Sequence, residues 1–264
     1  MKKYFVIGNP IKHSLSPELH NYWIKLNKIN AIYEKKKLDS NDLENLILEI
    51  KKKNISGANV TVPFKNAVIP YLDELSEEAK KTQSVNTIYL KSGRVIGHNT
   101  DIEGFEKAIT NINFSFNNKK IFILGSGGVV PSIVYASINM GSSKIFISNR
   151  TKSKAEKVKN IFDIVQIVNW GEMPNFDVVI NATSLGLNKD DKINLDFTKI
   201  GKNKLFYDVI YNPGETNFLK TGKQLGNTIQ NGKLMFIYQA FLAFKLWHNV
   251  EPSINNETIK ILDQ

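Results

Sequence analysis

The chain has 264 residues, 42% of them hydrophobic and 23% charged, which is ordinary for a globular protein and long enough for two domains. It has no cysteine, so disulfides and thiolate metal sites are excluded. The net charge of +10 does not indicate a nucleic-acid partner, because 33 of the 35 basic residues are scattered lysines and only Arg94 and Arg150 are arginines. No apolar run reaches the roughly 18 residues of a membrane span or resembles a signal peptide. We therefore expect a cytoplasmic protein with no metal, nucleic-acid or membrane partner.

Strand and helix patterns alternate through the first hundred residues. Apolar or alternating strands are expected at 4–8, 31–36 and 57–62, and helices at 17–26, 42–53 and 67–81. Residues 84–90 and 95–101 flank a Ser-Gly turn and predict a β-hairpin, followed by a helix over 102–110.

A loop rich in proline and hydroxyl groups follows the first strand, at residues 9–21. Ser14 has no structural duty there and is well placed to bind a small polar ligand. Ser16 precedes Pro17, so a helix cap is an equally good interpretation of its hydroxyl.

Further polar side chains stand at the ends of the next strands. Thr61 and Lys65 come where the third strand ends, although a lysine in that place is more often solvent-facing. Asn86 and Asp101 begin and end the hairpin, so antiparallel pairing brings them close together. Asp101 is also a candidate cap of the helix that follows.

Residues 121–150 predict a βαβ unit that binds a dinucleotide. An apolar strand leads into Gly125-Ser126-Gly127-Gly128, and a helix is expected from Val129 to Met140 before a second strand at 144–147. Glycines let the backbone approach a pyrophosphate closely, and the helix start attracts its charge. The match to the dinucleotide fingerprint is imperfect because Val130 stands where the third glycine is usual.

The end of the second strand favours NADP over NAD. An NAD site usually has a carboxylate here to hold the ribose, but the sequence reads Asn149-Arg150-Thr151-Lys152-Ser153-Lys154. Arg150 and Lys154 can instead bind a 2′-phosphate, the first through a bidentate fork and the second as a point charge.

The remaining chain continues the alternation. A helix is expected at 153–162, strands at 177–186 and 205–213, and a helix at 234–247. Thr183 and Tyr211 fall at the carboxyl ends of the two strands, where an open parallel sheet binds its ligands. Gln239 lies beside the apolar stripe of the last helix and needs a polar partner there.

These segments together resemble the shikimate dehydrogenase family. The motifs occur in the family's order over nearly the whole chain: G-N-P-I-x-H-S-L-S-P, N-V-T-V-P-F-K, S-V-N-T, G-x-N-T-D, G-S-G-G, N-R-T, N-A-T-S-x-G, Y-D-x-x-Y-x-P and G-x-x-M-x-x-x-Q. The resemblance implies an α/β fold of two domains: a substrate-binding domain at 1–101, completed by a C-terminal helix at 232–264, and a Rossmann NADP-binding domain at 102–231. It also implies reversible NADPH-dependent reduction of 3-dehydroshikimate to shikimate, on the pathway to aromatic amino acids, by a monomer or homodimer.

The resemblance also implies roles for individual residues. Lys65 and Asp101 resemble the family's catalytic pair. The implied substrate-binding residues are Ser14, Ser16, Thr61, Asn86, Tyr211 and Gln239, together with Asp101. The implied cofactor-binding residues are Gly125, Ser126, Gly127, Gly128, Val129, Asn149, Arg150, Lys154, Thr183, Val209 and Gly232.

Two departures from the family pattern and three alternatives remain. The terminal motif reads Gly232-Lys233-Leu234-Met235 where the family commonly has G-L-G-M, and Lys154 stands where a second arginine is frequent. The alternatives are a relative that also uses quinate, with NAD as a further option, a dinucleotide-binding sensor without catalysis, and a nucleic-acid binder. Intact Lys65 and Asp101 favour the enzyme.

Overall fold

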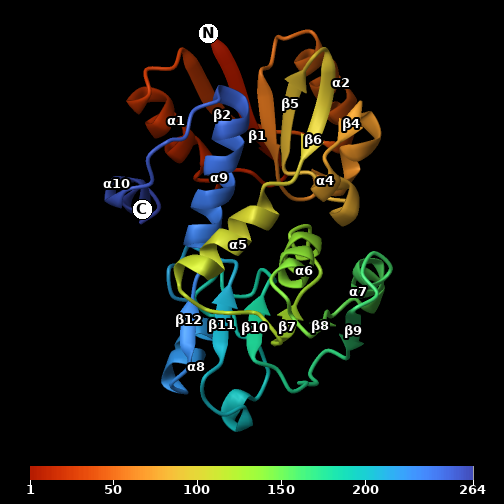
Figure 1. The fold of residues 1–264 in the computed structure, drawn as a ribbon, viewed down its shortest axis with the longest axis vertical. Helices are drawn as coiled ribbons and strands as arrows, with labels where there is room; N and C mark the ends of the chain where they lie inside the picture. The colour runs from red at the N-terminus through yellow and green to blue at the C-terminus, as the bar shows by residue number, and fades with distance from the viewer. Residues whose placement is uncertain (264) are drawn as a thin grey trace. The chain divides into compact units, whose positions relative to one another are not determined.

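The computed structural model describes residues 1–263, which form two compact units (Figure 1). The first unit comprises Met1–Gly104 with Ile237–Leu262, and the second comprises Phe105–Phe236 with Asp263. Across this described part of the chain, no helix is long and apolar enough to cross a membrane.

The first unit is built on a mixed six-stranded sheet with the order β2-β1-β3-β5-β6-β4. Its strands are β1 (Lys2–Gly8), β2 (Ala31–Lys37), β3 (Gly57–Val60), β4 (Glu74–Leu75), β5 (Thr87–Lys91) and β6 (Arg94–His98). Strands β1, β2 and β3 are parallel, whereas β3 and β5 are antiparallel and β5 and β6 form the predicted hairpin.

Helices cover both faces of this sheet, and the alternation of β1 explains how. Ile7 packs with Leu46 and Ile50 of α2 in one core, whereas Tyr4 points the other way and its ring lies 4.8 Å from that of Trp247 in α9. The helices are α1 (Ser16–Leu26), α2 (Leu43–Lys51), α3 (Phe64–Ala67), α4 (Glu77–Thr82), the start of α5 (Asp101–Asn111), most of α9 (Lys233–His248) and α10 (Asn256–Lys260).

The prediction of one helix over 67–81 is wrong. The segment contains the end of α3, a single 3₁₀ turn at Ile69–Tyr71, strand β4, and most of α4, which starts after the capping Ser76. Pro70 disfavours a continuous helix because it lacks an amide hydrogen, and the Asp73 amide donates to Val95 O of the neighbouring hairpin instead.

The second unit is an all-parallel six-stranded sheet with the order β12-β11-β10-β7-β8-β9. Its strands are β7 (Lys120–Leu124), β8 (Lys144–Ser148), β9 (Val165–Val168), β10 (Val178–Asn181), β11 (Leu205–Asp208) and β12 (Thr228–Gln230). The chain runs outward from β7 through β8 and β9 and then returns to β10 on the other side of β7. The sheet therefore has its topological switch point between β7 and β10, where open α/β sheets bind ligands.

The predicted βαβ unit is confirmed, with α6 (Val130–Asn139) between β7 and β8. The second compact unit also contains helices α7 (Lys152–Lys159) and α8 (Asn217–Gln224). Phe122 and Phe206 pack with Phe218 of α8 on one face, and Tyr207 meets Phe105 of α5 on the other. The sequence pattern did not predict β9, β12, α8 and α10, because these elements are short and partly exposed and therefore give weak periodicity.

Candidate active site

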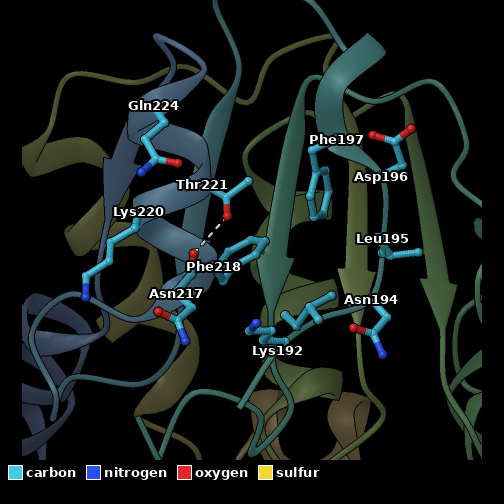
Figure 2. A pocket seen from close by; sticks show the side chains of 11 residues that line it. Lys192, Asn194, Leu195, Asp196, Phe197, Asn217, Phe218, Lys220, Thr221 and Gln224 are labelled. Carbon is cyan, nitrogen blue, oxygen red and sulfur yellow. Dashed lines mark hydrogen bonds between the residues drawn. The ribbon is translucent and has the colours of Figure 1, made fainter. Parts of the chain in front are cut away.

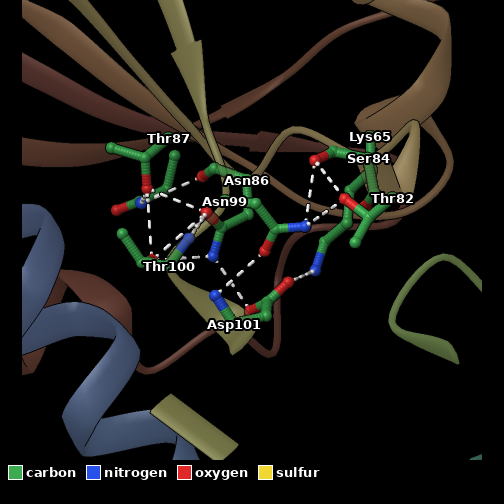
Figure 3. Close-up of polar contacts among 9 residues, drawn as sticks. Lys65, Thr82, Ser84, Asn86, Thr87, Asn99, Thr100 and Asp101 are labelled. Carbon is green, nitrogen blue, oxygen red and sulfur yellow. Dashed lines mark hydrogen bonds and ion pairs between the residues drawn. The ribbon is translucent and has the colours of Figure 1, made fainter. Parts of the chain in front are cut away.

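Lys65 and Asp101 form a buried ion pair, shown in Figure 3. Lys65 lies in α3, directly after β3 and Pro63, and Asp101 is the first residue of α5. Lys65 and Asp101 are only 9% and 5% exposed, respectively. Lys65 Nζ donates to Asp101 Oδ2 at 2.5 Å. Such a buried pair is costly to assemble and gives little net stability, so its presence favours a chemical role.

Asn86 holds the other oxygen of this carboxylate. Its Nδ2 donates to Asp101 Oδ1 at 2.9 Å, and its Oδ1 accepts from the Thr100 amide at 2.8 Å and from Thr87 Oγ1 at 3.0 Å. Because these donors fix which end of the amide is oxygen, the donor end of Asn86 faces Asp101. Figure 3 shows the resulting network around the hairpin end. Thr87 and Thr100 were missed by sequence analysis, although both stand inside motifs quoted for the family.

Further hydrogen bonds join the two serines to each other and Tyr33 to Asn59. Ser14 Oγ donates to Ser16 Oγ at 3.2 Å, and in the neighbouring strands Tyr33 donates to Asn59 Oδ1 at 2.7 Å. Asn59 Nδ2 then donates to the Asn86 carbonyl at 3.0 Å. Ser16 does not cap α1 with its side chain, so the cap interpretation was wrong. Asn59 links Tyr33 to the Asn86 network.

Stacking on a buried histidine holds the ring of Tyr33 in place. Its ring stacks on His20 with centroids 4.2 Å apart, and burial lowers the pKa of His20 to about 3, which keeps the imidazole uncharged. Tyr33 and Asn59 were also missed, because strand residues 26 positions apart give no local signal of contact.

Replacing Tyr33 with phenylalanine is expected to lower the free energy of unfolding by about 1–3 kcal/mol, because Asn59 Oδ1 then stays buried without a donor. Denaturant unfolding measures the change. Tyr71→Phe is the control, since Tyr71 is exposed, and an equal effect of both substitutions contradicts the structural role of the Tyr33 hydroxyl.

The remaining predicted substrate residues lie in different places. Thr61 follows β3, and its amide donates to Ile7 O at 2.9 Å. Gln239 lies in α9 and packs closely against Gly104. A Cβ added at Gly104 would lie 3.0 Å from the backbone nitrogen of Gln239. Tyr211 belongs to the second unit, where its ring lies 4.6 Å from that of Phe236.

The turn after β7 fits a dinucleotide phosphate. Gly125 has φ +106°, and an added Cβ would lie 2.8 Å from Ala182 O, so only glycine is accommodated there. Gly127 and Gly128 are exposed, and an added Cβ at Gly127 would meet only Ala182 O, at 3.8 Å. Ser126 Oγ is buried without a hydrogen-bond partner among the described residues. An open backbone at the start of α6, with Val129 preceding the helix, can receive a pyrophosphate.

Gly125→Ala is expected to lower the free energy of unfolding by about 1–3 kcal/mol through backbone strain, with a further loss from the clash. Gly171→Ala is a matched control because Gly171 has φ +98° but no atom within 4 Å of an added Cβ. Denaturant unfolding is expected to show the larger loss at Gly125, and equal losses would show that strain alone matters.

The basic side chains after β8 are available for an anion. Arg150 and Lys154 are exposed, and neither side chain has a hydrogen bond or ion pair to the described residues. Asn149 Nδ2 donates to Thr151 O at 2.7 Å and tightens the turn that carries them. The structure thus leaves two cations beside the strand end where a dinucleotide's adenosine ribose lies in this fold.

Thr183, Val209 and Gly232 lie on the other side of β7, beyond β10 and β11. Thr183 Oγ1 donates to Asn181 Oδ1 at 2.7 Å, and the Val209 amide donates to Asn181 O at 3.0 Å. An added Cβ at Gly232 would be 2.1 Å from Val209 O, so the backbones at these two positions are in close contact.

A separate cavity of about 560 Å³ lies between α8 and the segment at 192–197, as Figure 2 shows. Polar and exposed groups such as Lys192, Asn194 and Gln224 line much of it. None of the predicted site residues contributes to it, so we do not assign it to the reaction.

Comparison with known proteins identifies the family. Residues 6–88 match the model described as shikimate dehydrogenase substrate binding domain, and residues 106–206 match that of shikimate / quinate 5-dehydrogenase. The chain is 56% identical to shikimate dehydrogenase (NADP(+)) of Pelagibacter ubique over the full length of both. Shikimate dehydrogenase from Aquifex aeolicus has a similar structure, with a TM-score of 0.90 and 34% identity over 100% of this chain and 98% of that one. That of Thermus thermophilus, in complex with NADP(H) and shikimate, gives 0.89 and 28% over 100% and 99%. The chain therefore belongs to the shikimate dehydrogenase family.

Proposed function

We propose that this protein is an NADP-dependent shikimate dehydrogenase that reversibly reduces 3-dehydroshikimate to shikimate. The observation that carries the proposal is the buried pair of Lys65 and Asp101, held by Asn86. A full-length relative at 56% identity is a shikimate dehydrogenase with NADP(+) in its name, and the solved relative from Thermus thermophilus holds NADP(H) and shikimate.

The substrate is a small acid with several hydroxyl groups, so hydrogen bonds must fix its orientation. We assign its carboxylate and hydroxyls to Ser14, Ser16, Thr61, Asn86, Asp101, Tyr211 and Gln239. In the first unit, the hydrogen bond between Ser14 and Ser16 and the Asn86 network already hold several of these side chains in defined positions. A preorganised site of this kind does not have to order its side chains when substrate binds.

Lys65 acts on the substrate oxygen that becomes an alkoxide when the ketone is reduced. When bound, NADPH supplies the hydride that reduces the ketone carbon. Lys65 Nζ then either donates a proton to the developing alkoxide or stabilises its charge as an ammonium. Asp101 orients Lys65 and has its second oxygen fixed by Asn86, so the ammonium is held in one place. If Lys65 is the proton donor in reduction, its neutral amine receives the proton of the substrate hydroxyl in the oxidation direction.

NADP is assigned to the second unit. The turn Gly125-Ser126-Gly127-Gly128 with Val129 receives the pyrophosphate, and Arg150 and Lys154 beside Asn149 bind the 2′-phosphate. Thr183, Val209 and Gly232 are assigned to the nicotinamide half. In these terms residues 1–101 with 232–264 form the substrate-binding domain and residues 102–231 the NADP-binding domain.

We also propose that the protein works in the cytoplasm as a monomer or homodimer. Each chain has a mass of 29.9 kDa, so light scattering of the purified protein is expected to give one or two times that value.

Initial rates of cofactor reduction test the function. Purified protein is assayed with shikimate or quinate, each with NADP or NAD. Turnover mainly with shikimate and NADP is expected. Comparable rates with quinate or NAD would indicate a relative of broader specificity, and no turnover in any combination would favour a binding protein.

A further inference from the structure

Asp208 is a buried carboxylate at the end of β11 for which the proposed reaction has no use. It is 0% exposed, and no lysine, arginine or histidine of the described chain forms an ion pair with it. Burial is the main cause that raises its pKa, to about 6. A buried charge without a cation is expensive, so a neutral residue would be expected here if packing alone mattered.

Three uncharged groups donate hydrogen bonds to this carboxylate. The Ile210 amide donates to Oδ1 at 3.0 Å, Thr216 Oγ1 donates to Oδ2 at 2.6 Å, and Asn181 Nδ2 lies 3.1 Å from Oδ1 and 3.2 Å from Oδ2. These donors come from the end of β10, the segment after β11 and the residue that caps α8. Asp208 thus joins three separate segments at the carboxyl ends of the strands.

The segments held by Asp208 carry the residues assigned to the nicotinamide half. Asn181 accepts hydrogen bonds from Thr183 Oγ1 and from the Val209 amide. The Gly232 amide donates to the carbonyl of Ile210, at 3.1 Å, so the contact of Gly232 with Val209 depends on the same segment. Each of these residues is at most two hydrogen bonds from the carboxylate.

The sheet order places this region opposite the adenosine end. Strand β8, which is followed by Arg150, lies on one side of β7, and β10 and β11 lie on the other. A dinucleotide with its pyrophosphate over the turn after β7 therefore extends its second half toward the ends of β10 and β11.

We infer that Asp208 is a positioning residue that fixes the backbone of the nicotinamide subsite while leaving the adenosine end unaffected. Its carboxylate accepts from all three segments at once, which a neutral side chain of this size cannot do. The inference rests on the proposed NADP site.

The test compares two ligands by titration: NADPH, and adenosine 2′,5′-bisphosphate, which lacks the nicotinamide half. In Asp208→Ala the Kd for NADPH is expected to rise about 10-fold or more, because three buried donors lose their acceptor. The Kd for the bisphosphate is expected to stay within about twofold. Asp208→Asn keeps one acceptor oxygen, so it is expected to lose about threefold in NADPH affinity, and it keeps the test open if the alanine variant does not fold. Asp163→Ala is the control, because Asp163 is exposed and has no side-chain hydrogen bond to the described residues.

Each outcome has one meaning. Selective loss of NADPH affinity, with partial rescue by asparagine, supports the positioning role. Equal loss of both ligands, or unchanged NADPH binding in both variants, overturns it. If the wild-type protein binds neither ligand, the proposed NADP site itself is wrong, and that result is separate from any effect at Asp208.

Discussion

Replacing Lys65 with alanine is expected to lower kcat by about 10²- to 10⁴-fold, the range over which a positioned proton donor or charge acts. The substitution removes the ammonium 2.5 Å from Asp101 and leaves nothing in the network to protonate or stabilise the alkoxide. KM for shikimate is expected to change much less, because Ser14, Ser16 and Asn86 remain. Initial rates at varied shikimate and saturating NADP give both values.

Two further variants make the Lys65 result interpretable. Alanine at position 65 also leaves Asp101 as a buried unpaired carboxylate, so thermal unfolding must be measured beside the kinetics. Lys65→Met keeps most of the side-chain volume and is expected to show a similar loss of kcat. Lys91→Ala is the matched control, since Lys91 is exposed at the end of β5. A kcat near that of the wild type in folded Lys65→Ala protein would remove Lys65 from the chemistry.

Replacing Arg150 with alanine is expected to raise KM for NADP by about 10- to 100-fold, the loss of a charged hydrogen-bond pair to phosphate. KM for NAD is expected to stay nearly constant, because NAD has no 2′-phosphate for the guanidinium to bind. The ratio of the two KM changes isolates the phosphate contact from any general damage to the second unit.

The chain contains only one other arginine, and it provides the control for Arg150. Arg94 is exposed and pairs with Glu74 at 3.1 Å in the first unit, so Arg94→Ala is expected to leave both KM values unchanged. An equal rise in KM for NADP and NAD in Arg150→Ala would contradict a 2′-phosphate site. If Lys154→Ala alone abolished NADP selectivity, Lys154 would be the principal phosphate ligand instead.

Elements with strong local signals were predicted from the sequence. The apolar strand, glycine turn and helix at 121–140 and the Ser-Gly hairpin each depend on residues close together in the chain, and both were confirmed. The prediction of one helix at 67–81 was wrong because Pro70 and the pairing of β4 with β6 interrupt that segment. The pairing of β4 with β6 joins residues 22 positions apart and gives no local pattern.

The site residues likewise divide into those with a local sequence signal and those that depend on distant partners. Lys65 and Asp101 were selected from the sequence, but burial of Lys65 was not expected from a lysine after a strand. Tyr33, Asn59 and Asp208 act through partners in other segments, so no spacing rule identifies them. Asn59 and Asp208 do stand inside family motifs, which is the signal that would have found them.

Transfer of a labelled hydride tests the central claim most directly. Purified protein is incubated with 3-dehydroshikimate and NADPH that carries deuterium at both C4 positions of the nicotinamide, and the product is analysed by NMR. We expect shikimate with one deuterium per molecule, bound to the carbon that was the ketone, in amounts equal to the NADP formed. Loss of the ketone without deuterium in the product, or no oxidation of NADPH, would contradict it.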